Sequence, residues 1–383
     1  MGYKIVNQNG KQAIFLGDRQ VSKRWDSIYA YEMLDGQSPY YIARHNKKEA
    51  IFHIDNKYQP ITKWFDKIYS YGLVEGNSDY YIVEHNNRQA IFHINNPDAP
   101  ISQWFHEISA GNFLEGRSEY YLAQLNNKQA IYHIDNPNKP ISNWWDSIRM
   151  DGILEGCSDY YIVDQNGIEM IFHKDCKEFP ISGQWDYIYA TGLLEGQSNY
   201  YIVQHKDKRA IFHKDDPVNP VSRWWHGINE NGIVNGKSKY YMVHIVSWNM
   251  FLHAIFHIDN PDQPVTKLWS RISADSLLDG KSEYYIARND EGKKAIFHIS
   301  NISNPISNWW DDIKEIGIVS GQSPYYIATR DDGKQAVFDV SDPNRPVIDW
   351  TDEIEEYMNI VKGQNTEYNK DNIDMYNQYF EIY

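Results

Sequence analysis

The chain of 383 residues is 42% hydrophobic and 15% aromatic, and it carries a net charge of −15. This composition supports a sizeable core, whereas so acidic a surface repels phosphate backbones, so we expect a folded protein without a nucleic-acid partner. No segment approaches the ~20 apolar residues of a membrane span, and no signal-peptide core is visible, so the sequence predicts a soluble, cytoplasmic protein without a membrane partner.

A period of about forty residues runs through the sequence. A Tyr-Tyr pair, an Ala-Ile-Phe motif, an aromatic residue followed by Asp or His, and a Leu-x-Gly-x-Ser motif recur in step. The tyrosine pairs begin at Tyr40, Tyr80, Tyr120, Tyr160, Tyr200, Tyr240, Tyr284 and Tyr325, and the Ala-Ile-Phe motif or a near variant occurs nine times. The chain therefore consists of related units.

The first half of each unit has the pattern of a β-hairpin. In the unit 80–119, residues 80–84 and 90–94 are runs of aromatic and β-branched side chains, which favour strands. Residues 85–89 between them are polar, so the two runs predict a hairpin with a turn over 85–89.

The second half of the unit predicts a turn and further strands. Proline cannot donate to a strand ladder, so Pro97 and Pro100 indicate a turn over 95–100. A third strand is expected over 101–108 and a fourth, short one over 111–114, before glycine turns the chain into the next unit. Four strands in forty residues are typical of a propeller blade.

We therefore predict an all-β fold of nine repeats in a single body over residues 1–363. The favoured architecture is a closed, propeller-like ring, because closure removes exposed strand edges, and the alternative is an open curved β-solenoid. The Tyr-rich, acidic segment 364–383 would supply a closing strand near its end. The units are 3–39, 40–79, 80–119, 120–159, 160–199, 200–239, 240–283, 284–324 and 325–363.

The repeated pattern A-I-F-H-I-D-N-P…P-I-S…W-D-x-I…L-x-G resembles that of bacterial WG-type repeat proteins, with Ala50-Ile51 and Ala130-Ile131 where that family has Trp-Gly. Residues 337–346 are similar to the repeats of propellers built on Asp-Pro-x-x-Pro turns. Both resemblances imply β-repeat folds that are used for binding, and neither implies catalytic residues.

Two recurring side-chain types are candidate ligand-binding groups. A histidine follows the Ala-Ile-Phe motif in seven units, where we expect packing and turn hydrogen bonds, with a metal-binding, anion-binding or pH-responsive ladder as the alternative. The pairs Trp145-Asp146 and Trp185-Asp186 would suit a carbohydrate, since indole faces stack on sugar rings, although a tryptophan repeated once per unit favours core packing. No nucleophile–base set, phosphate loop or metal-ligand spacing is visible, so we expect no catalytic activity, metal or cofactor.

The seventh unit breaks the pattern. Its hairpin is four residues longer than in the preceding units, and the stretch 246–252 around this insertion is rich in apolar residues, with Val246, Trp248, Met250, Phe251 and Leu252. These side chains either fold back onto a neighbouring repeat or form an exposed anchor, as apolar patches often do at contact sites.

The favoured function is a non-catalytic scaffold that binds another protein through the stretch 246–252, and the acidic charge suits a cationic partner. One alternative is a multivalent carbohydrate-binding protein, in which repeated weak sites give avidity. The other alternative is an acidic inhibitor of a basic toxin or nuclease.

Overall fold

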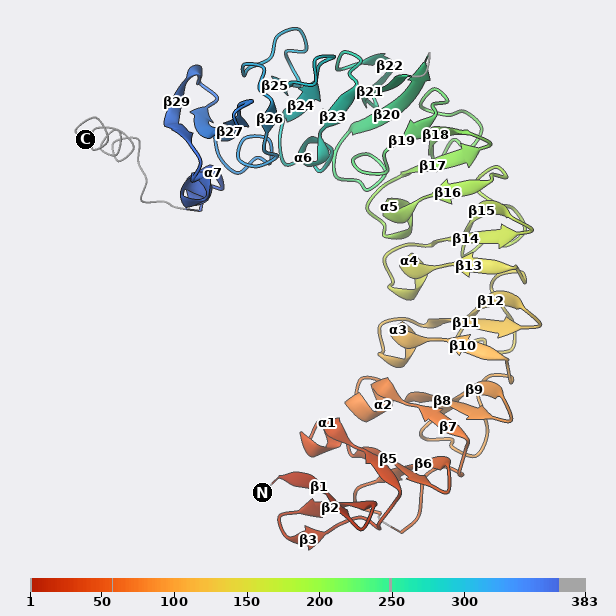
Figure 1. Cartoon of the computed structure of the whole chain (residues 1–383). Helices are drawn as coiled ribbons and strands as arrows, with labels where there is room; N and C mark the ends of the chain where they lie inside the picture. Colours follow the sequence, from red (N-terminus) through yellow and green to blue (C-terminus); the bar gives the residue numbers. More distant parts are fainter. Residues whose placement is uncertain (1, 57, 248–249, 365–383) are drawn as a thin grey trace. The chain divides into compact units, whose positions relative to one another are not determined.

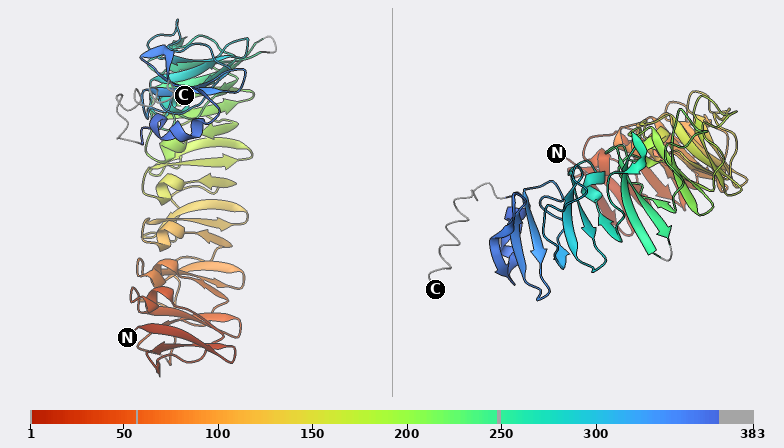
Figure 2. Two further views of the ribbon diagram at one scale, coloured as in Figure 1. Left: turned by 60° about the vertical axis from the view of Figure 1, so that its left-hand side comes forward. Right: turned by 90° about the horizontal axis from the view of Figure 1, so that it is seen from above.

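The computed structural model describes residues 2–56, 58–247 and 250–364, and it confirms an all-β repeat fold. The described residues form nine antiparallel sheets of three or four strands, which we number 1 to 9 along the chain. They belong to two compact units, Met1–Ser182 with sheets 1 to 5 and Gly183–Tyr383 with sheets 6 to 9. Within Met1–Ser182 the sheets stack in chain order (Figures 1 and 2).

Each sheet contains the hairpin that the sequence predicts. The hairpin strands are β1 (Tyr3–Gln8) and β2 (Lys11–Leu16), β5 (Tyr40–His45) and β6 (Lys48–His53), β8 (Tyr80–His85) and β9 (Arg88–His93), β11 (Tyr120–Leu125) and β12 (Lys128–His133), β14 (Tyr160–Gln165) and β15 (Ile168–His173), β17 (Tyr200–His205) and β18 (Lys208–His213), β20 (Tyr240–Ser247) and β21 (Met250–His257), β24 (Tyr284–Arg288) and β25 (Lys294–His298), and β27 (Tyr325–Thr329) and β28 (Gln335–Asp339).

The hairpin turns are tighter than the polar run suggested. In sheet 3 the turn is Asn86-Asn87, with φ angles of 52° and 58°, and Asn126-Asn127 in sheet 4 has φ angles of 52° and 59°. Two consecutive residues with positive φ are characteristic of the type I′ turn, whose twist matches that of the flanking strands. Asparagine tolerates this conformation better than most residues, which explains its recurrence there.

The third strand of each repeat is shorter than predicted and pairs with a different hairpin. The expected strand 101–108 contributes only β10 (Glu107–Ser109), which pairs with β11 of the following repeat instead of with β9. The two backbone groups of Phe105, just before β10, bond to Gln89 in β9. The chain thus bonds first to one sheet and then to the next, which joins neighbouring sheets through the backbone.

The same exchange recurs along both compact units. The short strands that pair with a following hairpin are β4 (Ser27–Tyr29), β7 (Lys67–Tyr69), β10, β13 (Ser147–Arg149), β16 (Tyr187–Tyr189), β19 (Gly227–Ile228), β23 (Arg271–Ser273) and β26 (Asp312–Ile313). Three further strands lie outside a hairpin, namely β3 (Arg19–Gln20) beside β2, β22 (Asn260–Pro264) beside β21, and β29 (Asp342–Thr351) beside β28.

The predicted fourth strand over 111–114 is wrong, because these residues form the one-turn helix α3 (Gly111–Leu114). Only six residues, 110–115, separate the short strand from Gly116 in the following turn, and a helical turn lets Phe113 and Leu114 both enter the core. The other helices are α1 (Tyr31–Leu34), α2 (Tyr71–Glu75), α4 (Asp151–Leu154), α5 (Thr191–Leu194), α6 (Asp275–Leu278), the 3₁₀ helix η1 (Ile354–Tyr357) and α7 (Met358–Val361). In Met1–Ser182, α1 to α4 lie on one side of the stack and the hairpin turns on the opposite side (Figure 1).

A buried hydroxyl accepts a hydrogen bond from the second hairpin strand in each of sheets 1 to 8. In sheet 4, Ile141 N–H donates to the carbonyl of Ile131, and Ile131 N–H donates to Ser142 Oγ at 2.9 Å. The Ser142 hydroxyl in turn donates to the carbonyl of Asn143. The same amide-to-hydroxyl bond joins Ile14 to Ser22, Ile51 to Thr62, Ile91 to Ser102, Ile171 to Ser182, Ile211 to Ser222, Ile255 to Thr266 and Ile296 to Ser307.

The core lies between successive sheets. Side chains alternate across each hairpin, so Tyr41 and Phe52 of sheet 2 face sheet 1, whereas Ile51 faces sheet 3. Trp25, between sheets 1 and 2, is 8% exposed and packs on Phe52 with ring centroids 5.0 Å apart. All described tryptophans are buried or half-buried, which confirms that they fill the space between sheets.

Several predictions from the sequence are not tested by the residues that the structure describes. Closure into a ring, the open solenoid and the single body over 1–363 stay predictions. The closing strand expected near the end of 364–383 and the side chain of Trp248 lie outside the described residues.

Candidate functional site

The hairpin of sheet 7 is the candidate site that the sequence singles out. Its strands β20 and β21 have eight residues each, against six in β17 and β18 of sheet 6. The ladder continues without a slip from Tyr240 opposite His257 to Ser247 opposite Met250. The four additional residues therefore lengthen both strands by two residues each and carry the hairpin tip beyond the polar position where other hairpins turn (Figure 1).

The described part of this tip exposes three apolar side chains. Phe251 is 70% exposed, Met250 55% and Val246 40%. Val246 lies directly opposite Phe251 in the ladder, so these two side chains share one face of the hairpin. Leu252 is half-buried, and Ile245 opposite it packs against the core that contains Tyr241. The exposed anchor therefore comprises Val246 and Phe251 on one face of the hairpin and Met250 on the other face, which also carries the half-buried Leu252.

Three histidines lie at the base of the tip. His244 and His253 face each other across the ladder with ring centroids 4.6 Å apart. His226 Nδ1 accepts a hydrogen bond from Val246 N–H at 3.3 Å, and His253 Nδ1 lies 3.2 Å from the carbonyl oxygen of Ser270. Burial lowers the pKa of His244 below its ordinary value, and nearby His253 and Arg209 lower it further.

The Trp-Asp pairs make contacts within the scaffold. Trp145 is half-buried and packs on Phe172, with ring centroids 5.4 Å apart. The Asp146 carboxylate accepts a hydrogen bond from Asn166 N–H at 2.7 Å and pairs with the Lys128 ammonium at 2.6 Å. The hydrogen bond from Lys128 and that from Asn166 lower the pKa of Asp146. Its carboxylate thus caps the adjacent hairpin turn.

The second pair has the same arrangement. Trp185 is half-buried and packs on Phe212 at 5.3 Å, while Asp186 accepts the N–H of Lys206 in the hairpin turn. The packing of both tryptophans agrees with the core role that the sequence favoured, whereas the bonds from the aspartates to the hairpin turns were not predicted. Carbohydrate binding by the pairs stays a prediction.

The histidine series makes turn hydrogen bonds, as the sequence predicted. In sheet 4 the His133 ring packs edge-on against Tyr120 at 4.9 Å, and its Nδ1 accepts a hydrogen bond from Asp135 N–H at 3.2 Å. The corresponding bond recurs at His53, His93, His173, His213, His257 and His298. Within the described ranges no group of three His, Cys, Asp or Glu side chains is placed to hold a metal ion.

Sequence reasoning overlooked two features. One is the set of buried serines and threonines that accept a hydrogen bond from the Ala-Ile-Phe strand. These residues belong to the repeated Pro-Ile-Ser motif, but the sequence does not show that they lie beside that strand. The other is a pocket between sheets 2 and 3, which Tyr29 of β4 and Glu49 of β6 line together with residues of β7.

No described helix is long and apolar enough to cross a membrane.

Comparisons with known proteins identify no family. No protein-family model matches the sequence, and no curated protein matches it. Among solved structures, Kluyveromyces lactis Hsv2 is 12% identical with a TM-score of 0.28, over 58% of this chain and 72% of that chain. A eukaryotic initiation factor is 10% identical with a TM-score of 0.33, over 91% and 96% of the two chains. TM-scores this low establish no shared fold, so the fold assignment rests on the strand pairing described above.

Proposed function

We propose that this chain is a non-catalytic β-repeat scaffold that binds another protein through the tip of the β20–β21 hairpin. The observation that carries the proposal is the exposure of Val246, Met250 and Phe251 together at the end of a hairpin whose base is fixed in a core. The sheet 6 hairpin, by comparison, ends in His205 and Lys208 around its turn. Apolar side chains clustered on a protein surface tend to mark contact sites, and large apolar anchors carry much of the energy of an interface.

The apolar tip and the negative net charge of the chain indicate what kind of partner would bind. An apolar recess that encloses the hairpin end would contact Phe251 on one face and Met250 on the other, and basic residues around it would be attracted to a chain with a net charge of −15. The outer edge of β21 can also take part in the contact through its backbone. At His253 this edge is occupied, because His253 exchanges both main-chain hydrogen bonds with Trp269. Main-chain N–H and C=O groups face the same edge at every second residue of a strand, so those of Phe251 face the same edge as those of His253, past the residue that pairs with Trp269.

The first experiment identifies the partner at this site. A photo-crosslinking phenylalanine analogue replaces Phe251 in the native host, and a control chain carries it at Phe179, which precedes Pro180 and is 74% exposed. A protein crosslinked through position 251 and absent from the position 179 sample is the expected result.

The second experiment measures the contribution of the anchor. The affinity of the purified partner is compared for wild type, the double variant Met250→Ser/Phe251→Ser and the control Phe179→Ser. Buried hot-spot side chains contribute at least about 2 kcal/mol, so the double variant should bind at least roughly 25-fold more weakly, while the control binds normally. Because both side chains are exposed, the melting temperature should stay close to that of wild type. Unchanged affinity, or a loss that coincides with unfolding, contradicts the proposal.

A further inference from the structure

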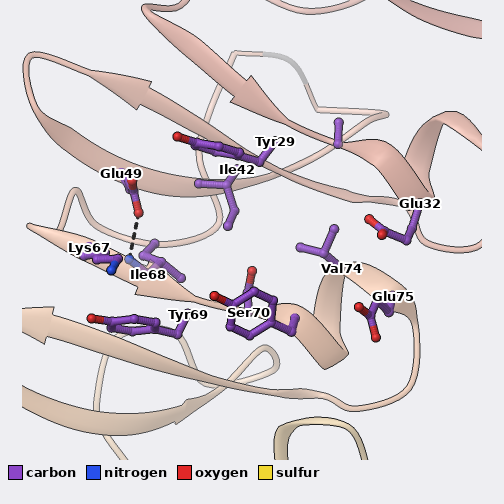
Figure 3. Close-up of a pocket in the computed structure, with 12 residues that line it drawn as sticks. Tyr29, Glu32, Ile42, Glu49, Lys67, Ile68, Tyr69, Ser70, Val74 and Glu75 are labelled. Atoms are coloured by element: carbon purple, nitrogen blue, oxygen red, sulfur yellow. Dashed lines mark hydrogen bonds between the residues drawn. The ribbon is translucent and has the colours of Figure 1, made fainter. Parts of the chain in front are cut away.

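A pocket of 350 Å³ lies between sheets 2 and 3 in the unit Met1–Ser182. Its walls come from β4, β5, β6, β7 and the short helices α1 and α2. Figure 3 shows Glu49 and Lys67 at one end, Glu32 and Glu75 at the end formed by the helices, and Tyr29 along one wall. Its volume is at the lower end of the range for small-molecule sites, which suits one side chain or a small ligand.

Glu49 is a buried carboxylate whose charge the fold does not require. It is 8% exposed, and one of its oxygens accepts a hydrogen bond from Ile68 N–H at 2.8 Å. The equivalent residues Gln12, Gln89 and Gln129 accept the same hydrogen bond from the next short strand with an uncharged amide. An amide therefore suffices for this structural role.

No cation within the described residues forms an ion pair with Glu49. The ammonium of Lys67, which also lines the pocket, lies 4.3 Å from the centroid of the Tyr69 ring. Burial of a carboxylate is costly unless an opposite charge or further hydrogen bonds compensate it. The site thus combines a buried negative charge with a neighbouring open volume.

In two other sheets, the residue equivalent to Glu49 or to Tyr29 contacts a guanidinium group of the chain. In sheet 5, Glu169 occupies the position of Glu49 and pairs with Arg149 at 2.6 Å, and Arg149 occupies the position of Tyr29. In sheet 6, Tyr189 occupies the position of Tyr29, and the guanidinium carbon of Arg209 lies 4.3 Å from its ring centroid. Sheet 2 has both acceptors, the carboxylate and the tyrosine ring, without an arginine at either position.

We propose that the pocket between sheets 2 and 3 binds the guanidinium of an arginine side chain presented by a basic partner. Glu49 accepts its N–H groups, and the ring of Tyr29, which is 44% exposed, supplies an aromatic face. Glu32 and Glu75 add negative potential near the helices, which attracts a cation and repels anions. A guanidinium fits this pair of acceptors better than an ammonium, because its plane can stack on a ring while its edge binds a carboxylate.

The test uses a small probe, so its outcome is independent of the hairpin partner. Ligand-observed NMR titration follows N-acetyl-L-arginine methylamide, with the citrulline analogue as an uncharged isostere and the lysine analogue as an ammonium. We expect saturable binding of the arginine probe and at least tenfold weaker binding of the other two. No saturable binding of the arginine probe, or equal binding of the citrulline analogue, overturns the proposal, and tighter binding of the lysine analogue overturns its assignment to a guanidinium.

Two variants and a matched control locate the binding. Glu49→Gln retains an acceptor for Ile68 N–H, as Gln89 does for its own neighbour, and should fold while binding at least tenfold more weakly. Tyr29→Arg provides the guanidinium within the chain, as Arg149 does, and should also abolish binding. Glu107→Gln, at an exposed position of β10, changes the net charge equally and should leave binding unchanged. Wild-type affinity in a folded Glu49→Gln variant overturns the site.

Discussion

The buried hydroxyl at each sheet edge leads to a sharp prediction for Ser142. Its side chain is 1% exposed, accepts a hydrogen bond from Ile131 N–H at 2.9 Å and donates to the carbonyl of Asn143 at 2.8 Å. Ser142→Ala removes both bonds and leaves a buried amide unpaired, which costs about 1–3 kcal/mol. Ser142→Thr retains the hydroxyl, and Thr62 and Thr266 occupy the equivalent position in sheets 2 and 7.

Urea unfolding and amide hydrogen exchange measure this cost. In Ser142→Ala the free energy of unfolding should fall by about 1–3 kcal/mol, and Ile131 N–H should exchange roughly 5- to 140-fold faster. Because each repeat contacts mainly its neighbours, the faster exchange should be confined to sheet 4 and the adjacent sheets 3 and 5. Ser142→Thr, and Ser109→Ala at an exposed position of β10, should both remain within about 0.5 kcal/mol of wild type.

Equal stability of Ser142→Ala and Ser142→Thr, with equal exchange rates at Ile131 N–H, would contradict this role of the hydroxyl. Such a result would mean that water or a shifted backbone group satisfies the amide without the hydroxyl. If amide exchange became faster by the same factor throughout sheets 1 to 5, the effect of the hydrogen bond would not be local to sheet 4 and its neighbours.

Three other predictions follow from individual residues. The lowered pKa of His244 means that the unfolded chain binds its proton more readily, so stability should decrease as pH falls below about 6.5, and urea titrations of His244→Gln should show a weaker decrease. Burial raises the pKa of Tyr41 to about 12, so stability should decrease above about pH 10, and Tyr41→Phe should unfold at higher pH by circular dichroism. Gly72→Ala should lower the melting temperature, with a cost of about 1–3 kcal/mol, because its Cβ would collide with a backbone carbonyl of α3, whereas Gly111→Ala meets no atom and should not.

The repeat and its local elements could be predicted because they depend on neighbours in the sequence. Alternating apolar residues fix the hairpin strands, and asparagines such as Asn86 and Asn87 fit a turn with positive φ. The extended hairpin of sheet 7 was equally visible, since four additional residues in one unit lengthen its ladder without a register shift.

The pairing of the short strands could not be predicted, because a three-residue strand such as β10 has no pattern that selects one hairpin over another. Its choice of β11 depends on Phe105, which is already bonded to the preceding sheet. Similarly, Phe113 and Leu114 suit either a strand or one helical turn, and the space between sheets selects the helix.

The sequence by itself determined that this protein is a series of β-hairpin repeats with one extended, apolar tip. Only the tertiary structure decided which side chains meet between sheets. Tyr29 and Glu49 are twenty residues apart, and their shared pocket exists because one short strand is laid against the following hairpin. Recurring motifs record local geometry, whereas a site between sheets depends on how those hairpins stack.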